Sequence, residues 1–246
     1  MKLDRIIYLS ILAGALLFFS TCKPDSCLHG DGENTTLHME TDSFSYVSLR
    51  GMFDVVMVQD TTYYVEFEGG SQALEYVQTN NDGKNLTCYN TNNCAFLRGY
   101  KKIKLYIHFV SIKRMDVFET CKITSQIPIT SDFYFTVQAD MADVDLLVDC
   151  DRLNFWANMT SGGVYKFRGR CNYARLEGYY AAKIDSKELN ADQLFIKNFS
   201  VADFDVFAGS KLTAEIHNKG NIYYSGTPSV IIDTVNTGSG KLIHAN

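Results

Sequence analysis

The chain has 246 residues, of which 46% are hydrophobic and 13% aromatic, so it can bury a sizeable core. Its formal net charge is −5, and no broad basic surface is expected. This charge balance argues against nucleic acid as a partner. The aromatic residues include 16 Phe and 15 Tyr but a single Trp, a composition that suits β-rich chains.

The N-terminal residues predict export. Two basic residues precede an apolar run over residues 6–19, which is too short to span a bilayer comfortably but has the length of a signal-peptide core. The four residues that end at Cys22 resemble the lipobox of bacterial lipoproteins. We therefore expect a signal peptide over residues 1–21, cleavage before Cys22 and lipidation of that cysteine. An ordinary signal peptide, with Cys22 left as a thiol, is the alternative.

Lipidation at Cys22 predicts a cell-envelope location at the outer membrane, and leaves open whether the protein faces the surface or the periplasm. Residues 22–36 contain Pro, Gly and polar residues without apolar periodicity, which indicates a flexible tether. From residue 37 the chain alternates as strands do, and only residues 71–79 are open to a short helix or a loop.

A repeat of about twenty residues organises the second half of the chain. Large apolar residues that recur at this interval, called anchors below, are Val144, Tyr165, Ile184, Phe204, Ile222 and Leu242. Two positions before each anchor stands Ala or Gly, and two positions after most of them stands another apolar residue. This period of two predicts a strand with one buried face, and its return predicts strands stacked in successive rungs.

The small residue before each anchor is expected at a corner, where a neighbouring wall or backbone comes close. The fold class is therefore all-β, with a β-solenoid like a parallel β-helix whose rungs have about twenty residues. We assign the solenoid to residues 111–246. Residues 37–110 are expected to form an N-terminal β region that packs on it or caps it.

Two stretches near the start and the end of this region carry a family resemblance. They are Gly51-Met52-Phe53-Asp54-Val55 with Val65-Glu66-Phe67-Glu68-Gly69, and Gly220-Asn221-Ile222-Tyr223-Tyr224-Ser225-Gly226-Thr227-Pro228 with Gly238-Ser239-Gly240-Lys241-Leu242. They resemble the family called "putative auto-transporter adhesin, head GIN domain". The family's internal Gly-Ser-Gly turns are mostly replaced here, so this chain is a divergent member. The resemblance implies a Bacteroidetes-type envelope lipoprotein with a β-solenoid and an adhesin role, and brings no catalytic residue or cofactor.

The repeat also aligns two cysteines. Cys150 and Cys171 both lie six positions after their anchors, in a column that marks a turn. Stacked rungs lie about 4.8 Å apart, which is within the reach of a disulfide. The sequence allows two alternatives, a disulfide bridge between Cys150 and Cys171 or two buried free thiols at these positions. Cys88 and Cys94 flank a turn-rich stretch and are a second candidate pair. No Cys/His spacing predicts a metal site.

Outward positions beside the anchors bring Asp185, Asp203 and Asp205 together, with Lys183 next to them. Such carboxylates could bind a cation or serve as the acid and base of glycan cleavage. A solvated face in which Asp and Lys neutralise one another is the alternative. Tyr179, Tyr180 and Tyr223 are candidate rings for a glycan, although parity turns Tyr224 inward and leaves Tyr180 open.

No catalytic motif is found in the sequence. We therefore expect a non-enzymatic, lipid-anchored protein that presents a rigid surface for adhesion or ligand binding, with a membrane, a glycan or another protein as partner and no cofactor. A polysaccharide-cleaving β-helix enzyme and a structural envelope scaffold without external ligand are the alternatives.

Overall fold

The computed structural model describes residues 31–91, 102–138 and 141–245. About two thirds of these residues lie in strands, which confirms the all-β class. The first nine strands are β1 (Asn34–Glu40), β2 (Tyr46–Arg50), β3 (Phe53–Gln59), β4 (Tyr64–Gly70), β5 (Val77–Asn81), β6 (Asn85–Asn90), β7 (Ile103–Phe109), β8 (Arg114–Val117) and β9 (Cys121–Ser125). The others are β10 (Phe133–Val137), β11 (Ala142–Ala157), β12 (Gly162–Ser200), β13 (Phe204–Phe207), β14 (Lys211–Ile216), β15 (Ile222–Ser225), β16 (Val230–Asn236) and β17 (Leu242–His244).

A one-turn helix, α2 (Ser71–Leu74), lies between β4 and β5. It occupies the start of the stretch for which the sequence left helix or loop open, and the end of that stretch belongs to β5 instead. Within the described ranges, no helix has the length and the apolar character needed to cross a bilayer.

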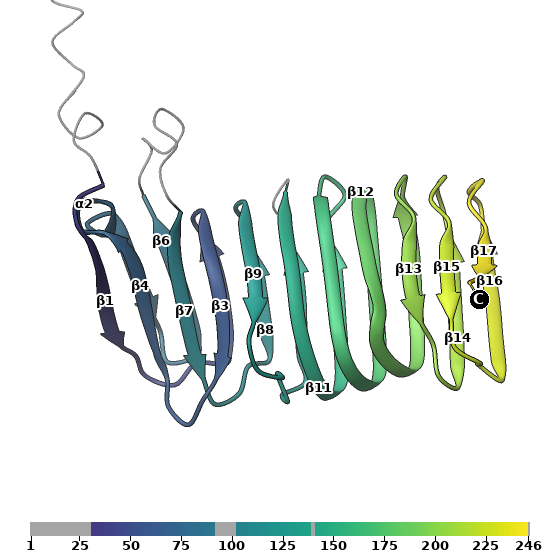
Figure 1. Ribbon diagram of the computed structural model, residues 1–246, viewed down its shortest axis with the longest axis horizontal. Helices are drawn as coiled ribbons and strands as arrows, with labels where there is room; N and C mark the ends of the chain where they lie inside the picture. The colour runs from purple at the N-terminus through teal and green to yellow at the C-terminus, as the bar shows by residue number, and fades with distance from the viewer. Residues whose placement is uncertain (1–30, 92–101, 139–140, 246) are drawn as a thin grey trace, which may run out of the picture.

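All 17 strands belong to one sheet. Figure 1 shows that the sheet is curled, so that two walls face each other along the long axis and are joined by bends along one side. Strand β1 lies at one end of this axis and β17 at the other, and from β8 onward the chain proceeds along the axis in sequence order. Long strands such as β12 pass around the bends, because the sheet continues from one wall into the next.

Between β8 and β17 the pairing along the axis is parallel, with partners about twenty residues apart. Val144 pairs with Tyr165, Phe204 with Ile222, and Ile222 with Leu242. These are three of the five anchor-to-anchor steps predicted from the repeat, so the stacking of those anchors is confirmed. Parallel, in-register pairing places equivalent side chains above one another.

The N-terminal end of the sheet is built differently. Strand β1 pairs antiparallel with β4, β4 antiparallel with β7, and β5 antiparallel with β6. The sequence showed strands here but no repeat that reveals their direction. The sheet is nonetheless continuous across residue 110, since β8 and β9 pair in parallel with β2 and β3. A division into two regions at that residue remains a proposal.

The core lies between the walls. Alternate residues are buried in many of the strands, as in β14 and in the first half of β11. The largest side chains that are almost fully buried include Tyr165 and Phe167, whose rings pack around Phe155 at centroid distances of 4.8 Å and 5.0 Å. Burial of such rings supplies most of the apolar driving force for folding.

The column of small residues lies where neighbouring backbones approach. A Cβ atom added to Gly163 would lie 2.1 Å from the carbonyl oxygen of Ala142, and one added to Gly220 would lie 2.0 Å from that of Ala202. At Gly240 the corresponding distance, to the oxygen of Gly220, is 2.1 Å. The predicted close approach at this column is therefore confirmed at these three glycines.

A buried amide stabilises the same region. Asn198 is fully buried, and its side-chain nitrogen donates hydrogen bonds to the backbone oxygens of Ala202, Gly220 and Asn221. Its side-chain oxygen accepts a hydrogen bond from the backbone of Ser200. A buried polar group must be paired in this way to offset its desolvation. Through these bonds Asn198 joins the turn at Ala202 to the following turn at Gly220.

Candidate functional site

The predicted acidic face exists, but its charges are paired. Asp185 and Asp205 are neighbours in the parallel register of β12 and β13. Lys183 lies 3.9 Å from Asp205, and Lys187 lies 3.7 Å from Asp185, measured from the lysine nitrogen to the nearer carboxylate oxygen. The third carboxylate, Asp203, accepts a hydrogen bond of 2.7 Å from a backbone nitrogen.

The lysines thus partly neutralise carboxylates at this face, whereas Oδ1 of Asp185 is buried without a hydrogen-bond partner within the ranges that the structure describes. Among the residues that the structure describes, no group of three or more His, Cys, Asp or Glu side chains is arranged to hold a metal ion. The three aspartates have different partners and do not form a shared site. Cation binding and glycan cleavage at this face remain predictions.

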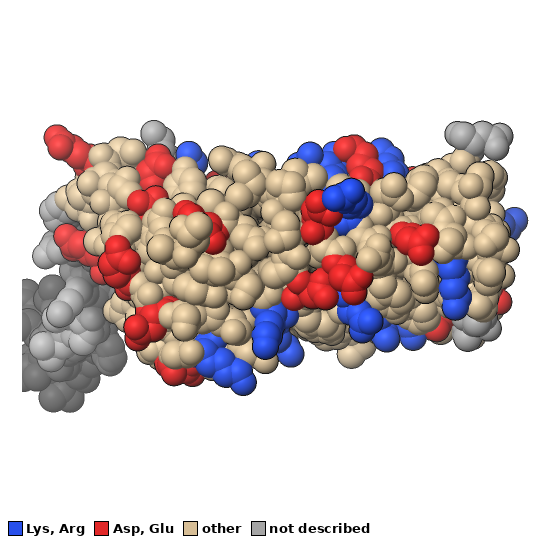
Figure 2. Space-filling view, turned by 90° about the horizontal axis from the view of Figure 1, so that it is seen from below, with Lys and Arg blue, Asp and Glu red and all other residues tan. Residues whose placement is uncertain are grey.

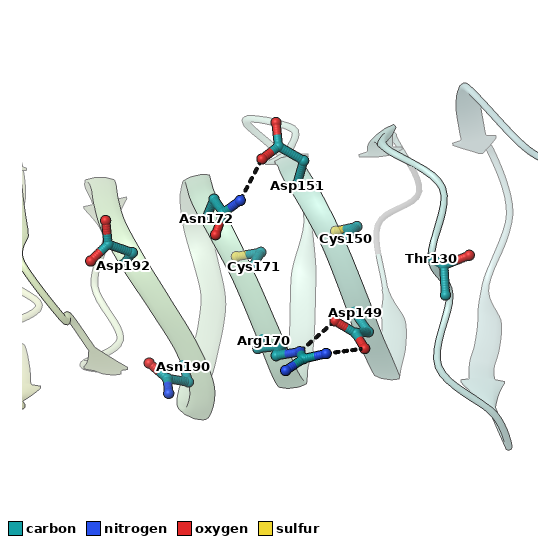
Figure 3. Close-up of a pocket in the computed structure, with 9 residues that line it drawn as sticks. All are labelled: Thr130, Asp149, Cys150, Asp151, Arg170, Cys171, Asn172, Asn190 and Asp192. Carbon is teal, nitrogen blue, oxygen red and sulfur yellow. Dashed lines mark hydrogen bonds and ion pairs between the residues drawn. The ribbon is translucent and has the colours of Figure 1, made fainter.

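A polar hollow of about 510 Å³ lies on the bends between the walls. It crosses successive rungs and is lined by Thr130, Asp149, Cys150, Asp151, Arg170, Cys171, Asn172, Asn190 and Asp192. Figure 3 shows Asp149 and Arg170 turned toward each other from adjacent rungs, and Asp151 turned toward Asn172. Sequence reasoning marked this column as a turn and identified its cysteines, but not the polar residues on either side of them.

Charge-assisted hydrogen bonds hold this hollow together. The Arg170 guanidinium donates to both oxygens of Asp149 at 2.6 Å and 2.9 Å, and Asn172 donates to Asp151 at 2.6 Å. The bond from Arg170 holds the pKa of Asp149 below its ordinary value. These donors and acceptors satisfy one another, and the bonds link β12 to β11.

The two cysteines of the hollow are direct neighbours, since Cys150 pairs with Cys171 in the parallel register of β11 and β12. Both are free thiols in this structure and are buried, with exposed fractions of 9% and 4%. Burial raises the pKa of each thiol to about 12, so both are protonated at neutral pH. The disulfide between them remains a prediction.

Of the second candidate pair, Cys88 is a buried free thiol, and Cys94 lies outside the described residues, as does Cys22. Burial raises the pKa of Cys88 to about 12, with a further contribution from Cys121. Cys121 is also buried and donates a hydrogen bond to the backbone oxygen of Gly51. The sequence suggested no partner for Cys121, whereas the fold brings it near Cys88.

The surface charge is mixed. Figure 2 shows acidic and basic side chains next to one another near the middle of the face seen from below, with uncharged residues between these groups. On this face no single sign of charge extends over the molecule. A long-range field that attracts strongly charged ligands is therefore not expected from this side.

The comparisons with known proteins bear on this architecture. Residues 43–228 match the model of the family described as "putative auto-transporter adhesin, head GIN domain". The chain belongs to this family. The resemblance seen in the sequence is thereby confirmed, over most of the region expected. A search of curated proteins finds no match.

Solved structures share the fold at low sequence identity. An adhesin candidate from Bacteroides fragilis aligns with a TM-score of 0.77 and 17% identity, covering 87% of this chain and 97% of that one. One from Parabacteroides distasonis aligns with a TM-score of 0.62 and 18% identity, covering 88% and 98%. A second protein from that species is named as a candidate lipid-binding protein. It aligns with a TM-score of 0.60 and 16% identity, covering 88% of this chain and 98% of that one. At such identity these likenesses establish the fold alone.

Proposed function

We propose that the protein is a lipid-anchored component of the bacterial cell envelope, and that its sheet is a β-solenoid presenting a rigid wall for adhesion or ligand binding. The observation that carries this proposal is the parallel register of about twenty residues, which repeats from rung to rung up to β17. Stacked rungs yield a stiff, repetitive surface on which binding groups stay in fixed positions. Membership of an adhesin family supports the same function.

The anchor is proposed from sequence alone. Residues 1–21 would be removed, Cys22 would carry the lipid, and residues 22–36 would separate the sheet from the membrane. In Figure 1 the described part begins at β1, at one end of the long axis. A tether at that end would let the far rungs project from the membrane, which suits a protein that meets an external partner.

We propose binding without catalysis. Lysines or a backbone nitrogen already engage the carboxylates of the acidic face, as a solvated surface requires. The name of one structural relative mentions lipid binding. The hollow at Asp149 and a second hollow at Asp54 are lined mainly by polar and charged groups, which favours a hydrophilic ligand over an acyl chain.

Proteinase shaving of intact producing cells tests the location. The native protein is compared with Cys22→Ala, which cannot be lipidated. We expect added proteinase to degrade the native protein on whole cells and the variant to leave the cell fraction.

A periplasmic marker protein serves as the control for membrane integrity. Protection of the native chain until the outer membrane is opened would exclude adhesion from outside and leave a periplasmic scaffold. Retention of the Cys22→Ala variant in the envelope would show that the anchor is not a lipid on this cysteine.

A further inference from the structure

A shallow hollow on the outside of one wall has a different character from those above. It has a volume of about 300 Å³ and is lined by Arg114, Tyr134, Thr136, Gln138 and Trp156. The register explains its shape, because Thr136 lies between Asp116 of β8 and Trp156 of β11. The small side chain of Thr136, only 2% exposed, forms the floor, and larger neighbours form the rim.

Two aromatic rings form part of this rim. Tyr134 is 38% exposed, and the Arg114 guanidinium lies 5.4 Å from the centre of its ring. Trp156, the only tryptophan of the chain, meets Tyr179 edge to face at a centroid distance of 6.1 Å. Beyond Tyr179, the rings of Phe199 and His217 continue the row, stacked at 4.4 Å and 4.0 Å.

Stacked rings cover one another's faces. The ring planes of Tyr179, Phe199 and His217 are nearly parallel, with interplanar angles of 1° between successive rings. A ligand could therefore reach mainly the edges of these rings. Trp156 has a ring neighbour on one side only among the described residues. The row therefore ends at the hollow, where aromatic surface is next to open space.

The hollow also offers polar groups that the protein does not use. Arg114 donates its Nε hydrogen to Asp116 at 2.8 Å, and the Thr136 hydroxyl donates to the same carboxylate. In contrast, the Tyr134 hydroxyl, the Trp156 ring nitrogen and the side-chain amide of Gln138 make no hydrogen bond to any described residue. The two aromatic rings of the hollow thus carry one free polar group each, and the Gln138 side chain adds a third.

We infer that this hollow, called the Trp156 site below, binds a pyranose unit of a neutral glycan. A pyranose has one face of C–H groups that packs on an aromatic ring and a rim of hydroxyls that both donate and accept hydrogen bonds. Small-ligand sites combine aromatic walls with a few polar groups in this way, and 300 Å³ is at the lower end of their volumes. The inference rests on the proposed function and names the ligand class for one part of the wall.

The charges beside the site favour a neutral sugar over an acidic one. The Asp116 carboxylate neutralises Arg114, whose Nε atom lies 2.8 Å from Oδ2 of Asp116. Glu177, the partner of Trp156 in the register, is buried and holds Arg175 at 2.5 Å. Each cation near Trp156 is thus matched by a carboxylate, and an anionic ligand would gain little electrostatic attraction.

The single tryptophan supplies the readout. Purified full-length protein is titrated with maltohexaose, chitohexaose and, as an acidic polymer, hyaluronan, while tryptophan emission is recorded. We expect a saturable change in emission with at least one of the two neutral oligosaccharides and none with hyaluronan. Tyr134→Ala should raise the Kd about tenfold, by loss of one ring contact and one hydroxyl.

A second variant guards against loss of folding in the first. Gln138→Ala removes one polar group at the rim and should raise the Kd severalfold with an unchanged circular dichroism spectrum. The matched control is Tyr180→Asn, which removes a ring that is 64% exposed but does not line the site. Asn tolerates the positive φ of 55° at this position, so the control should fold and bind normally.

Three results would overturn the inference. They are no emission change with either neutral oligosaccharide, a response to hyaluronan alone, or equal affinities for Tyr134→Ala, Gln138→Ala and the native protein. None of them would bear on the location of the protein, which the shaving experiment tests separately. Conversely, a periplasmic location would refute adhesion from outside without affecting sugar binding by the purified protein.

Discussion

Single residues decide whether neighbouring strands can approach one another. At Gly220 there is no room for a methyl group, since an added Cβ would lie 2.0 Å from the Ala202 carbonyl oxygen and 2.8 Å from the buried Asn198 amide nitrogen. The backbone contact cannot be relieved by a change of rotamer. Gly83, in contrast, has a positive φ of 85° and nothing within 4 Å of its added Cβ.

Gly220→Ala is therefore expected to destabilise the protein by about 3 kcal/mol, because the rung above must shift. Gly83→Ala is the matched control, with an expected cost of about 1 kcal/mol from backbone strain alone. Urea unfolding of both variants, followed by circular dichroism, gives the comparison. Equal stabilities of the two variants would contradict the close approach at Gly220.

At the scale of the element, parallel strands make equivalent positions into neighbours. Cys150 of β11 and Cys171 of β12 are paired in register, and both are buried. The Cα atoms of stacked residues, about 4.8 Å apart, lie within the range that a disulfide accepts. Their pKa of about 12 means that very little thiolate is present at neutral pH, so oxidation should be slow.

We predict that prolonged exposure to oxidised glutathione joins Cys150 to Cys171. Each thiol loses a proton and an electron, and the glutathione disulfide is reduced to two thiols. Intact mass should show the loss of two hydrogens, and the oxidised protein should be more stable by about 3 kcal/mol, since the bridge closes a loop of about twenty residues.

The variant Cys150→Ser is the control, since it keeps the other buried cysteines and cannot form this bridge. It should gain no stability under the same oxidant. Peptide mapping that finds Cys150 and Cys171 still alkylatable after the native protein has been oxidised would refute the predicted pairing.

At the scale of the whole molecule, hydrogen-bonded carboxylates are spread along the sheet. Hydrogen bonds from Thr61, Asn85 and Arg170 lower the pKa of Asp60, Asp82 and Asp149, respectively. Burial would raise the pKa of Glu215, but hydrogen bonds from Lys197 and His217 outweigh it and the pKa is lowered. The folded state thus favours the ionised form at both ends of the molecule.

A carboxylate whose pKa is lower in the folded state stabilises the protein fully above its unfolded pKa, near 4, and loses this effect as pH falls through the folded value. We predict that stability against urea is lost below about pH 4 and that Asp149→Asn is less stable than the native protein at pH 7. The difference between these two proteins should shrink as the pH approaches 3.

Asp42→Asn is the control for this prediction, because Asp42 is exposed and its side chain has no hydrogen-bond partner in the described part of the chain. The stability of the Asp42→Asn variant should follow that of the native protein at every pH. A gap between the native protein and Asp149→Asn that stays constant from pH 7 to pH 3 would show that the Arg170 contact does not depend on ionisation of Asp149.

The sequence by itself determined the all-β class, the stacking of anchors such as Val144 on Tyr165, and the crowded column at Gly220. A repeat can be recognised because equivalent residues of successive rungs meet the same environment, and each inward position therefore selects the same kind of side chain. The same reasoning predicts that Cys150 lies beside Cys171, and the register of β11 and β12 pairs these two residues.

The tertiary structure alone decided the antiparallel strands β1, β4 and β5, the outward position of Tyr180 and the Trp156 site. Outward side chains face water, so no repeated pattern marks them, and their neighbours can be inferred only where an anchor column is recognised, as for Asp185 and Asp205. Arg114, Tyr134 and Trp156 come from three strands and surround one hollow only because the lateral register sets them side by side. That register depends on contacts between residues about twenty positions apart, and the sequence shows no anchor column over β8 and β10 from which it could be inferred.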